Sequence, residues 1–222
     1  MSPRQLAFDL NLRPALGDED FLVAPSNEEA VAWIDRYPDW PSPAVVIVGP
    51  PGAGKTHLGR VFMARTEAVE IGVGELAEAI LVLGDAPKVF IDDASKIAGD
   101  DAAEEGLFHL YNKARSEGGA ILLTATDAPA RWPLALPDLA SRLKAAPAPV
   151  IGMPDDALLT ALLVKLFADR QLSVSEDVLD YVIPRMERSF AAARSFVSNI
   201  DQLALEKKRP ITVPLAREIL NG

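Results

Sequence analysis

The segment AVVIVGPPGAGKTHL, residues 44–58, decides the fold class of this 222-residue chain. A short apolar run rich in valine and isoleucine ends at Gly49, and residues 49–56 match the pattern G-x-x-x-x-G-K-[S/T] at every fixed position. The pattern predicts a strand, a loop and a helix, with the loop curled around a phosphate chain at the positive end of the helix. The alternative is a glycine-rich turn without a ligand, which the flanking strand and helix patterns disfavour.

Each residue type in this loop has a chemical reason to be there. Glycine allows backbone N–H groups to converge on a phosphate, Lys55 is expected to reach the β and γ phosphates, and Thr56 offers a hydroxyl to Mg²⁺. His57 is expected to contribute only its backbone N–H. The predicted nucleotide contacts from the loop are Pro51, Gly52, Ala53, Gly54, Lys55, Thr56 and His57.

A second buried-strand pattern, KVFIDDAS at residues 88–95, ends in two carboxylates. Because ligands of open α/β sheets bind at the carboxyl ends of the strands, we predict Asp92 as a Mg²⁺ ligand and Asp93 as a carboxylate that orients water. Aspartate is shorter than glutamate, so unaided hydrolysis is expected to be slow. A strand that ends in a solvated acidic turn is the alternative, and the phosphate loop makes it less favoured.

Three further features are ambiguous when taken alone. The strand pattern GAILLTAT, residues 119–126, places Thr126 and Asp127 at a strand end, where they either sense a γ-phosphate or form an ordinary Asx turn. Arg142 and Arg194 are candidates to accelerate hydrolysis by contacting a γ-phosphate, or else surface arginines in ion pairs.

Composition excludes several classes of function. The chain has no cysteine and two histidines, so disulfides, thiol catalysis and a zinc site are not expected. A formal net charge of −10 argues against a protein that binds duplex DNA by itself. The N-terminus lacks a signal-peptide pattern and no run is long enough to span a membrane, so we expect a cytoplasmic protein.

The order of elements predicts two folded parts. Strands alternate with helices as far as residue 153, which is typical of a three-layer α/β fold around a parallel sheet. Helix-like segments without a strand follow from residue 154, and they predict a small all-helical domain, a candidate lid over the nucleotide. The expected boundaries are therefore 17–153 and 154–222.

The chain resembles the AAA+ ATPases of the DnaA clade in the order of its motifs. These are the phosphate loop, FIDD at 90–93, the strand that ends in Thr126-Asp127, LPDLASRL at 136–143 and the helical bundle. The Hda group, DnaA-related proteins that inactivate the replication initiator, is most similar over nearly the whole chain. GLFHLYN at 106–112 and PLAREIL at 214–220 resemble corresponding Hda segments. The predicted elements end with the helical bundle and include no DNA-binding domain like that of an initiator, so we expect a regulator and not an initiator.

The resemblance implies roles for particular residues. It implies that Thr126 and Asp127 form sensor 1, that Arg142 is the arginine finger and that Arg194 is sensor 2. The stretch DFLVAPSNEEA, residues 20–30, resembles the segment that contacts adenine. It would place Leu22 and Val23 near the base of ADP or ATP.

The N-terminal run RQLAFDLNLRP, residues 4–14, resembles the short peptide with which replication proteins bind the β sliding clamp of DNA polymerase III. Gln5 would bond at the rim of the clamp pocket, and Leu6, Phe8 and Leu10 would be apolar anchors. An edge strand explains the same alternation of residues and is the alternative. In front of a DnaA-like module we favour a clamp-binding tail over residues 1–16.

Together these resemblances imply a clamp-tethered AAA+ regulator, in which Arg142 acts on ATP held by DnaA and so limits initiation of DNA replication. Its own ATPase activity would be weak, DNA contact would be only through the clamp, and it would associate with the replisome in the nucleoid without a membrane. Self-association through the AAA+ interface is possible. The rivals are an adaptor that loads a helicase and an independent P-loop NTPase or kinase.

Overall fold

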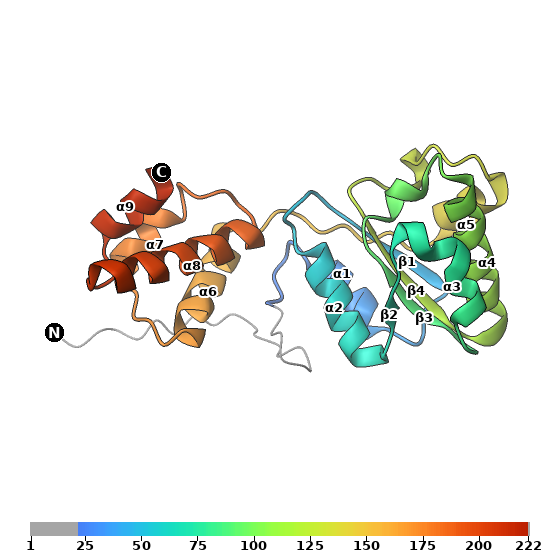
Figure 1. The fold of residues 1–222 in the computed structure, drawn as a ribbon, viewed down its shortest axis with the longest axis horizontal. Coiled ribbons are helices and arrows are strands. Elements are labelled where there is room, and N and C mark those ends of the chain that lie inside the picture. The colour runs from blue at the N-terminus through green and yellow to red at the C-terminus, as the bar shows by residue number, and fades with distance from the viewer. Residues whose placement is uncertain (1–21, 222) are drawn as a thin grey trace. The chain divides into compact units, whose positions relative to one another are not determined.

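The computed structural model describes residues 22–221, which form two compact units. The α/β unit runs from Pro25 to Gly152. The helical unit contains the segment from Met153 onward together with Leu22–Ala24. Figure 1 shows the elements of both units in chain order.

The α/β unit is built on a parallel sheet. Its strands are β1 (Ala44–Val48), β2 (Val69–Glu70), β3 (Lys88–Ile91) and β4 (Ala120–Ala125), in the order β1-β4-β3-β2. Every residue of β1 and β4 is buried, because helices cover both faces of the sheet. The parallel sheet predicted from the sequence is confirmed.

A further stretch of chain pairs with β1 on its outer side, although it is not a regular strand. The Val46 and Val48 N–H groups donate to the carbonyl oxygens of Pro147 and Pro149, each at 2.9 Å, and the Ile151 N–H donates to the Val48 carbonyl at 2.7 Å. Proline has no N–H to donate, so within sheets it is confined to edge strands, strand starts and bulges. The segment therefore accepts bonds from β1 and closes this edge of the sheet, a feature that the sequence patterns did not predict.

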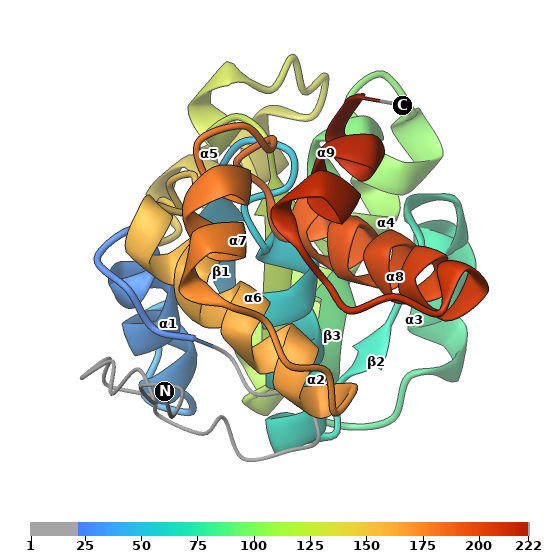
Figure 2. The same cartoon turned by 90° about the vertical axis from the view of Figure 1, so that its left-hand side faces the viewer.

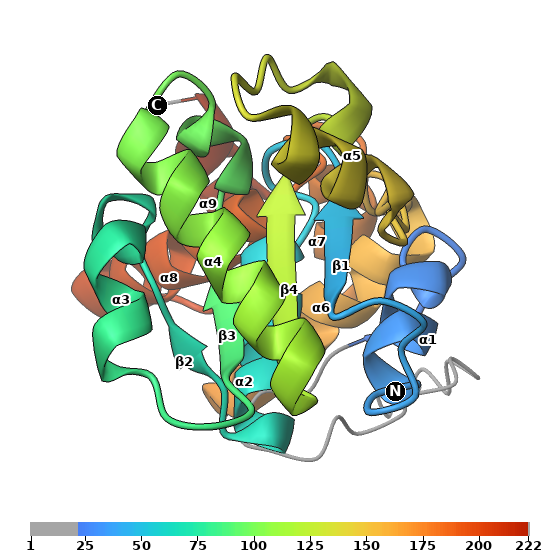
Figure 3. The ribbon, with the colours of Figure 1, turned by 90° about the vertical axis from the view of Figure 1, so that its right-hand side faces the viewer.

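Helices lie on both sides of the sheet, as Figures 1 and 3 show. One face is covered by α3 (Leu76–Val82), α4 (Asp101–Glu117) and α5 (Pro137–Ala145), and the other by α1 (Glu28–Asp35) and α2 (Lys55–Thr66). Short 3₁₀ turns, η1 (Val73–Glu75), η2 (Ala94–Ile97) and η3 (Pro129–Arg131), complete the connections. The expected three-layer arrangement is confirmed.

The helix that follows the phosphate loop lies unusually close to the sheet. A Cβ placed on Gly59 of α2 would overlap the ring of Phe90 on β3, which is itself fully buried. Glycine at this position therefore allows α2 to rest directly on an aromatic side chain. This contact packs the middle of α2 directly against β3.

The helical unit consists of α6 (Asp156–Asp169), α7 (Glu176–Val182), α8 (Phe190–Lys207) and α9 (Val213–Asn221), shown in Figure 2. Asp155 and Ser189 cap α6 and α8 by accepting the N–H groups of Leu158 at 2.8 Å and Ala192 at 3.0 Å. The predicted all-helical domain is confirmed. Within residues 22–221, no helix is long and apolar enough to cross a membrane.

Candidate nucleotide-binding site

The phosphate loop has the backbone that its glycines permit. Gly52 and Gly54 have φ values of 78° and 96°, in the left-handed region that other residues avoid. Gly54 is the N-cap of α2, and Lys55 is the first helical residue. The unpaired N–H groups at this helix start therefore face the turn of the loop, as an anion-binding site requires.

Lys55 is held in the loop by backbone carbonyls. Its side chain is 7% exposed, and Nζ donates to the carbonyl oxygens of Gly49 at 2.7 Å and Pro50 at 3.0 Å. Burial lowers the pKa of Lys55, and the nearby charges of Asp93 and Asp92 partly offset this shift. A buried ammonium bonded to neutral carbonyls is prepared to exchange them for the stronger interaction with phosphate oxygens.

Two elements bring hydroxyl and carboxylate groups together beside this lysine. The Thr56 hydroxyl donates to Oδ2 of Asp92 at 2.8 Å. These are the two residues predicted as Mg²⁺ ligands. Mg²⁺ is commonly bound through one or two protein oxygens in addition to phosphates and water, and this pair fits that chemistry.

A residue that sequence reasoning missed completes the cluster. Thr124 is fully buried on β4, its hydroxyl donates to the other carboxylate oxygen of Asp92, and it accepts the N–H of Asp93 at 3.0 Å. The pairing of Ile91 with Leu123 in the parallel sheet places Thr124 beside Asp92. A single threonine inside the apolar run of β4 was the signal that could have revealed it.

Asp93 is engaged by a neighbour. Its backbone lies in the left-handed region with φ of 50°, and its carboxylate pairs with Lys96 at 2.9 Å. This hydrogen bond raises the pKa of Lys96. Because the pair is exposed, it holds the carboxylate only weakly. The predicted role of Asp93 in orienting water stays a prediction.

Thr126 and Asp127 lie immediately beyond the end of β4, and both are exposed. The Asp127 carboxylate pairs with Arg131 at 3.3 Å, and its carbonyl oxygen accepts the Trp132 indole N–H at 2.8 Å. Asp127 thus organises the turn that follows the strand. Its contacts agree with an ordinary turn residue, and the sensor 1 role stays a prediction.

Three predicted nucleotide contacts belong to the helical unit. Leu22 is 5% exposed and packs in the core of that unit, and Val23 is partly exposed. Arg194 is exposed on α8. Their predicted roles at the base and the phosphates remain predictions.

Arg142, in the last turn of α5, lies against α4. Its guanidinium donates to Oδ1 of Asn112 and lies 4.7 Å from the ring centroid of Phe108 and 5.3 Å from that of Tyr111. These contacts hold the cation on aromatic faces while leaving it partly exposed. Arg142 therefore belongs to a surface of α4 and α5, separate from the lysine, threonine and aspartate contacts of the phosphate loop.

The predicted clamp contacts lie outside the described residues. They are Gln5, Leu6, Phe8 and Leu10.

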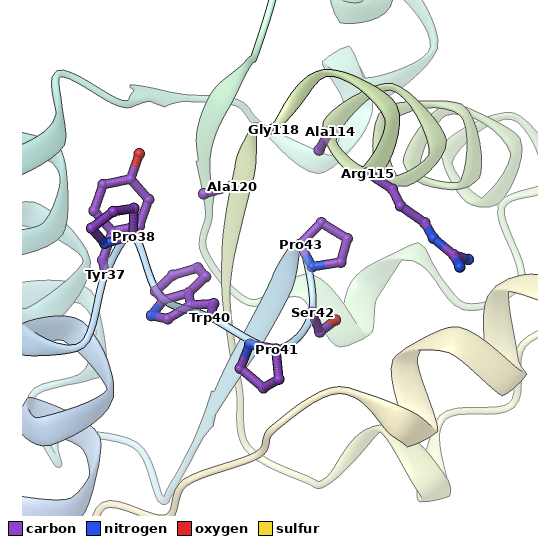
Figure 4. A pocket seen from close by; sticks show the side chains of 11 residues that line it. Tyr37, Pro38, Trp40, Pro41, Ser42, Pro43, Ala114, Arg115, Gly118 and Ala120 are labelled. Carbon is purple, nitrogen blue, oxygen red and sulfur yellow. The ribbon is translucent and has the colours of Figure 1, made fainter.

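A second concave region lies at the opposite end of the sheet. A pocket of about 300 Å³ lies between the α1–β1 connection and the α4–β4 connection, and its lining side chains are drawn in Figure 4. Tyr37, Trp40 and Pro43 contribute to its lining, beside Arg115. It contains none of the residues predicted from the sequence to bind nucleotide, and it lies at the amino ends of β1 and β4.

Comparisons with known proteins agree with this architecture. Residues 155–220 match the family model described as "Hda, lid domain". An uncharacterized protein of Haemophilus influenzae is 26% identical over 223 residues, which cover 96% of this chain and 94% of that protein. Among solved structures, domain III of the Thermotoga maritima replication initiation protein DnaA superposes with a TM-score of 0.77 at 18% identity, covering 90% of this chain and 93% of that one. AMPPCP-bound DnaA from Aquifex aeolicus gives 0.71 at 17% identity, covering 88% and 68%.

The sheet, the phosphate loop and these superpositions define the α/β unit as an AAA+ P-loop fold of the DnaA type. The match to the Hda lid-domain model covers residues 155–220 of the helical unit. The resemblance to the DnaA-related Hda group that the sequence predicted is thereby confirmed.

Proposed function

We propose that this protein is a clamp-tethered regulator that binds ADP or ATP with Mg²⁺ and stimulates ATP hydrolysis by DnaA. Initiation of DNA replication would thereby be limited. The observation that carries the proposal is the cluster of Lys55, Thr56 and Asp92 in a chain whose lid matches the Hda family. Among solved structures of the same fold is a DnaA bound to AMPPCP and single-stranded DNA, which supports an adenine nucleotide as ligand.

In this proposal the α/β unit holds the nucleotide. Lys55 exchanges its two carbonyl partners for phosphate oxygens, and backbone N–H groups at the start of α2 bind the same anion. Thr56 and Asp92 would hold Mg²⁺, which neutralises phosphate charge when bound. Because the side chain of Asp93 is shorter than that of a glutamate, the protein's own hydrolysis is expected to be weak.

Arg142 acts on the partner's nucleotide. Its contacts with Asn112, Phe108 and Tyr111 place it on the surface of α4 and α5, where a second AAA+ protein can meet it. An arginine supplied in trans accelerates phosphoryl transfer by roughly 10³ to 10⁵. A hydrogen bond and cation–π contacts that are partly exposed can break when the arginine turns toward DnaA.

The N-terminal tail, residues 1–16, determines where in the cell the protein acts. Gln5, Leu6, Phe8 and Leu10 bind the β sliding clamp, so stimulation occurs only where a clamp has been loaded onto DNA. Tethering raises the effective concentration of Arg142 near DnaA without any new contact. The protein is then cytoplasmic, at the replisome in the nucleoid, and reaches DNA only through the clamp.

The test is ATP hydrolysis by DnaA with DNA-loaded clamp. We would add wild-type protein, Gln5→Ala with Leu6→Ala, or Arg142→Ala, and use Arg115→Ala as the matched control. Arg115 is an exposed arginine of α4 in the same unit. Wild type and the control should accelerate hydrolysis, whereas both test variants should abolish the acceleration for different reasons, lost tethering and lost charge.

Two outcomes would contradict the proposal. If wild-type protein leaves hydrolysis by DnaA unchanged, the regulator interpretation fails, and a helicase-loading adaptor becomes the function to test. If the protein hydrolyses ATP rapidly without DnaA or clamp, it is an independent NTPase.

A further inference from the structure

Glu104 is a carboxylate buried in the α/β unit at a place that the proposed function does not use. It lies in the first turn of α4 and is 1% exposed. Within residues 22–221, no lysine or arginine pairs with it, and backbone N–H groups supply its partners. A buried carboxylate without hydrogen bonds would be strongly destabilising, so these N–H groups are essential to its burial.

The three donors come from two separate segments. Oε1 of Glu104 accepts the N–H of Gly99 at 3.2 Å and the N–H of Ala135 at 3.1 Å. Oε2 accepts the N–H of Leu136 at 2.8 Å. Gly99 follows η2, which begins immediately after Asp93, whereas Ala135 and Leu136 directly precede α5. One side chain of α4 therefore joins the segment after the strand carboxylates to the start of the helix that carries Arg142.

The start of α5 has no cap of its own. Its N-cap residue is Leu136, whose side chain cannot accept a hydrogen bond, and Pro137 follows in the first helical position. Glu104 accepts the N–H of the N-cap residue Leu136 and that of the preceding Ala135, and its negative charge lies at the positive end of the α5 dipole. The position of α5 is thus set at its first turn by Glu104.

The other end of α5 is held by the same stripe of α4. Glu104, Phe108 and Asn112 are spaced four residues apart, which places them on one face of a helix. Phe108 and Asn112 contact Arg142, but these contacts are partly exposed, whereas Glu104 is buried. The buried contact at Glu104 therefore holds the start of α5, the helix that carries Arg142.

We propose that Glu104 is a positioning residue, which caps α5 from α4 and so holds Arg142 in the register needed to act on a partner's nucleotide. The part of this proposal that concerns the partner rests on the proposed function. The part that concerns α5 stands on the three hydrogen bonds alone.

The first measurement is hydrogen exchange in the full chain, with Glu104→Gln and Glu104→Ala. The matched control is Glu105→Gln, which changes an exposed neighbour on the same helix. Glutamine keeps one acceptor oxygen but turns an amide NH₂ toward one of the donors, so it should have the smaller effect. We expect amides of residues 135–145 to exchange at least about tenfold faster in Glu104→Ala, with α2 and ADP affinity unchanged.

The second measurement is stimulation of DnaA by the same variants. The maximal rate should fall about tenfold in Glu104→Ala, while the half-saturating concentration, set by the tail, changes less than about twofold. Because Glu104 acts through Arg142, combining Glu104→Ala with Arg142→Ala should lose no more than Arg142→Ala alone.

The two measurements fail separately. Unchanged exchange in α5 would show that Glu104 does not hold this helix, and it would leave the proposed function intact. Faster exchange with full stimulation, or losses that add in the double variant, would overturn the positioning role. Absence of stimulation by wild type would overturn the proposed function, and with it the role of Glu104 toward a partner, but not the cap.

Discussion

Lys55 is a charged side chain that folding places in an unfavourable environment. Only 7% of it is exposed, and two neutral carbonyl oxygens are its hydrogen-bond acceptors. Burial lowers its pKa, so the charged form is less stable in the folded chain than in the unfolded one. A phosphate in the loop would relieve this cost.

We expect Lys55→Met to remove stabilisation by nucleotide. Wild type should gain about 2.7 kcal/mol when free Mg²⁺–ADP is 100 times its dissociation constant, whereas Lys55→Met should gain almost nothing. Urea denaturation with and without nucleotide measures the difference. Equal gains in both proteins would mean that Lys55 does not contact the phosphates.

The lowered pKa of Lys55 also predicts a pH dependence without nucleotide. Between the lowered pKa and the ordinary value of 10.5, the unfolded chain binds more protons than the folded one, so stability rises with pH. The free energy of unfolding of wild type relative to Lys55→Met should therefore increase as pH is raised toward 10.5. A difference that falls with pH would contradict this assignment.

Thr124 gives the third prediction at this scale. Thr124→Val keeps the shape of the side chain but removes the hydroxyl that bonds Asp92 and the Asp93 N–H. We expect a loss of about 1–3 kcal/mol in the free energy of unfolding, because the partly buried Asp93 N–H and the Asp92 carboxylate each lose a hydrogen-bond partner. Enhancement of nucleotide affinity by Mg²⁺ should fall as well. Thr124→Ser is the control that keeps the hydroxyl. If Thr124→Val and Thr124→Ser have the same stability and the same response to Mg²⁺, the Thr124 hydroxyl does not support Asp92.

At the scale of elements, α2 packs so closely on the sheet that no methyl group fits between them at Gly59. Gly59 touches the Phe90 ring so closely that no side chain fits between them. Most elements predicted from the sequence are present, since strands 44–48, 88–91 and 120–125 and the helix that starts at Lys55 follow the apolar patterns. Local patterns suffice to predict these elements because each one can bury its apolar side chains against any apolar surface.

Gly59→Ala should destabilise the protein by about 1–3 kcal/mol, because the methyl group must displace Phe90 or lift α2 from the sheet. Phe90→Leu should partly rescue it in the double variant, which would reveal coupling between the two positions. Gly84→Ala is the control, since a Cβ there meets nothing within 4 Å. Thermal unfolding reports the effect, and equal costs at Gly59 and Gly84 would disprove the close contact.

At the scale of the whole molecule, the net charge of the chain is unfavourable for direct binding to DNA. Its formal net charge of −10 opposes contact with a polyanion. In the proposed function, DNA is reached only through the clamp. The tail, the phosphate loop and Arg142 then act as three separable parts.

Without the clamp, we expect the protein to bind duplex DNA more weakly than about 10⁻⁴ M at physiological salt, the weak limit of non-specific binding. With loaded clamp, association should appear and should be lost in Gln5→Ala with Leu6→Ala. Fluorescence anisotropy of labelled DNA measures both conditions. Tight binding of bare duplex DNA would contradict the tethering model.

The sequence by itself determined the α/β class, the phosphate loop and the separate helical domain. These features follow from contiguous residues. Glycines at 52 and 54 permit the backbone of the loop, and the apolar residues after residue 154 recur with the period of a helix and not of a strand. The same reasoning reached Lys55, Thr56 and Asp92 because each lies at the end of a recognisable element.

Only the tertiary structure decided which distant residues complete the site. Thr124 meets Asp92 through the register of two parallel strands, and Glu104 caps a helix that begins 33 residues later in the chain. Pro147 and Pro149 close an edge of the sheet although prolines oppose strand formation. Such partners are chosen by packing across the fold, since buried polar groups must find whichever donor or acceptor the sheet brings near them, and no local pattern encodes that choice.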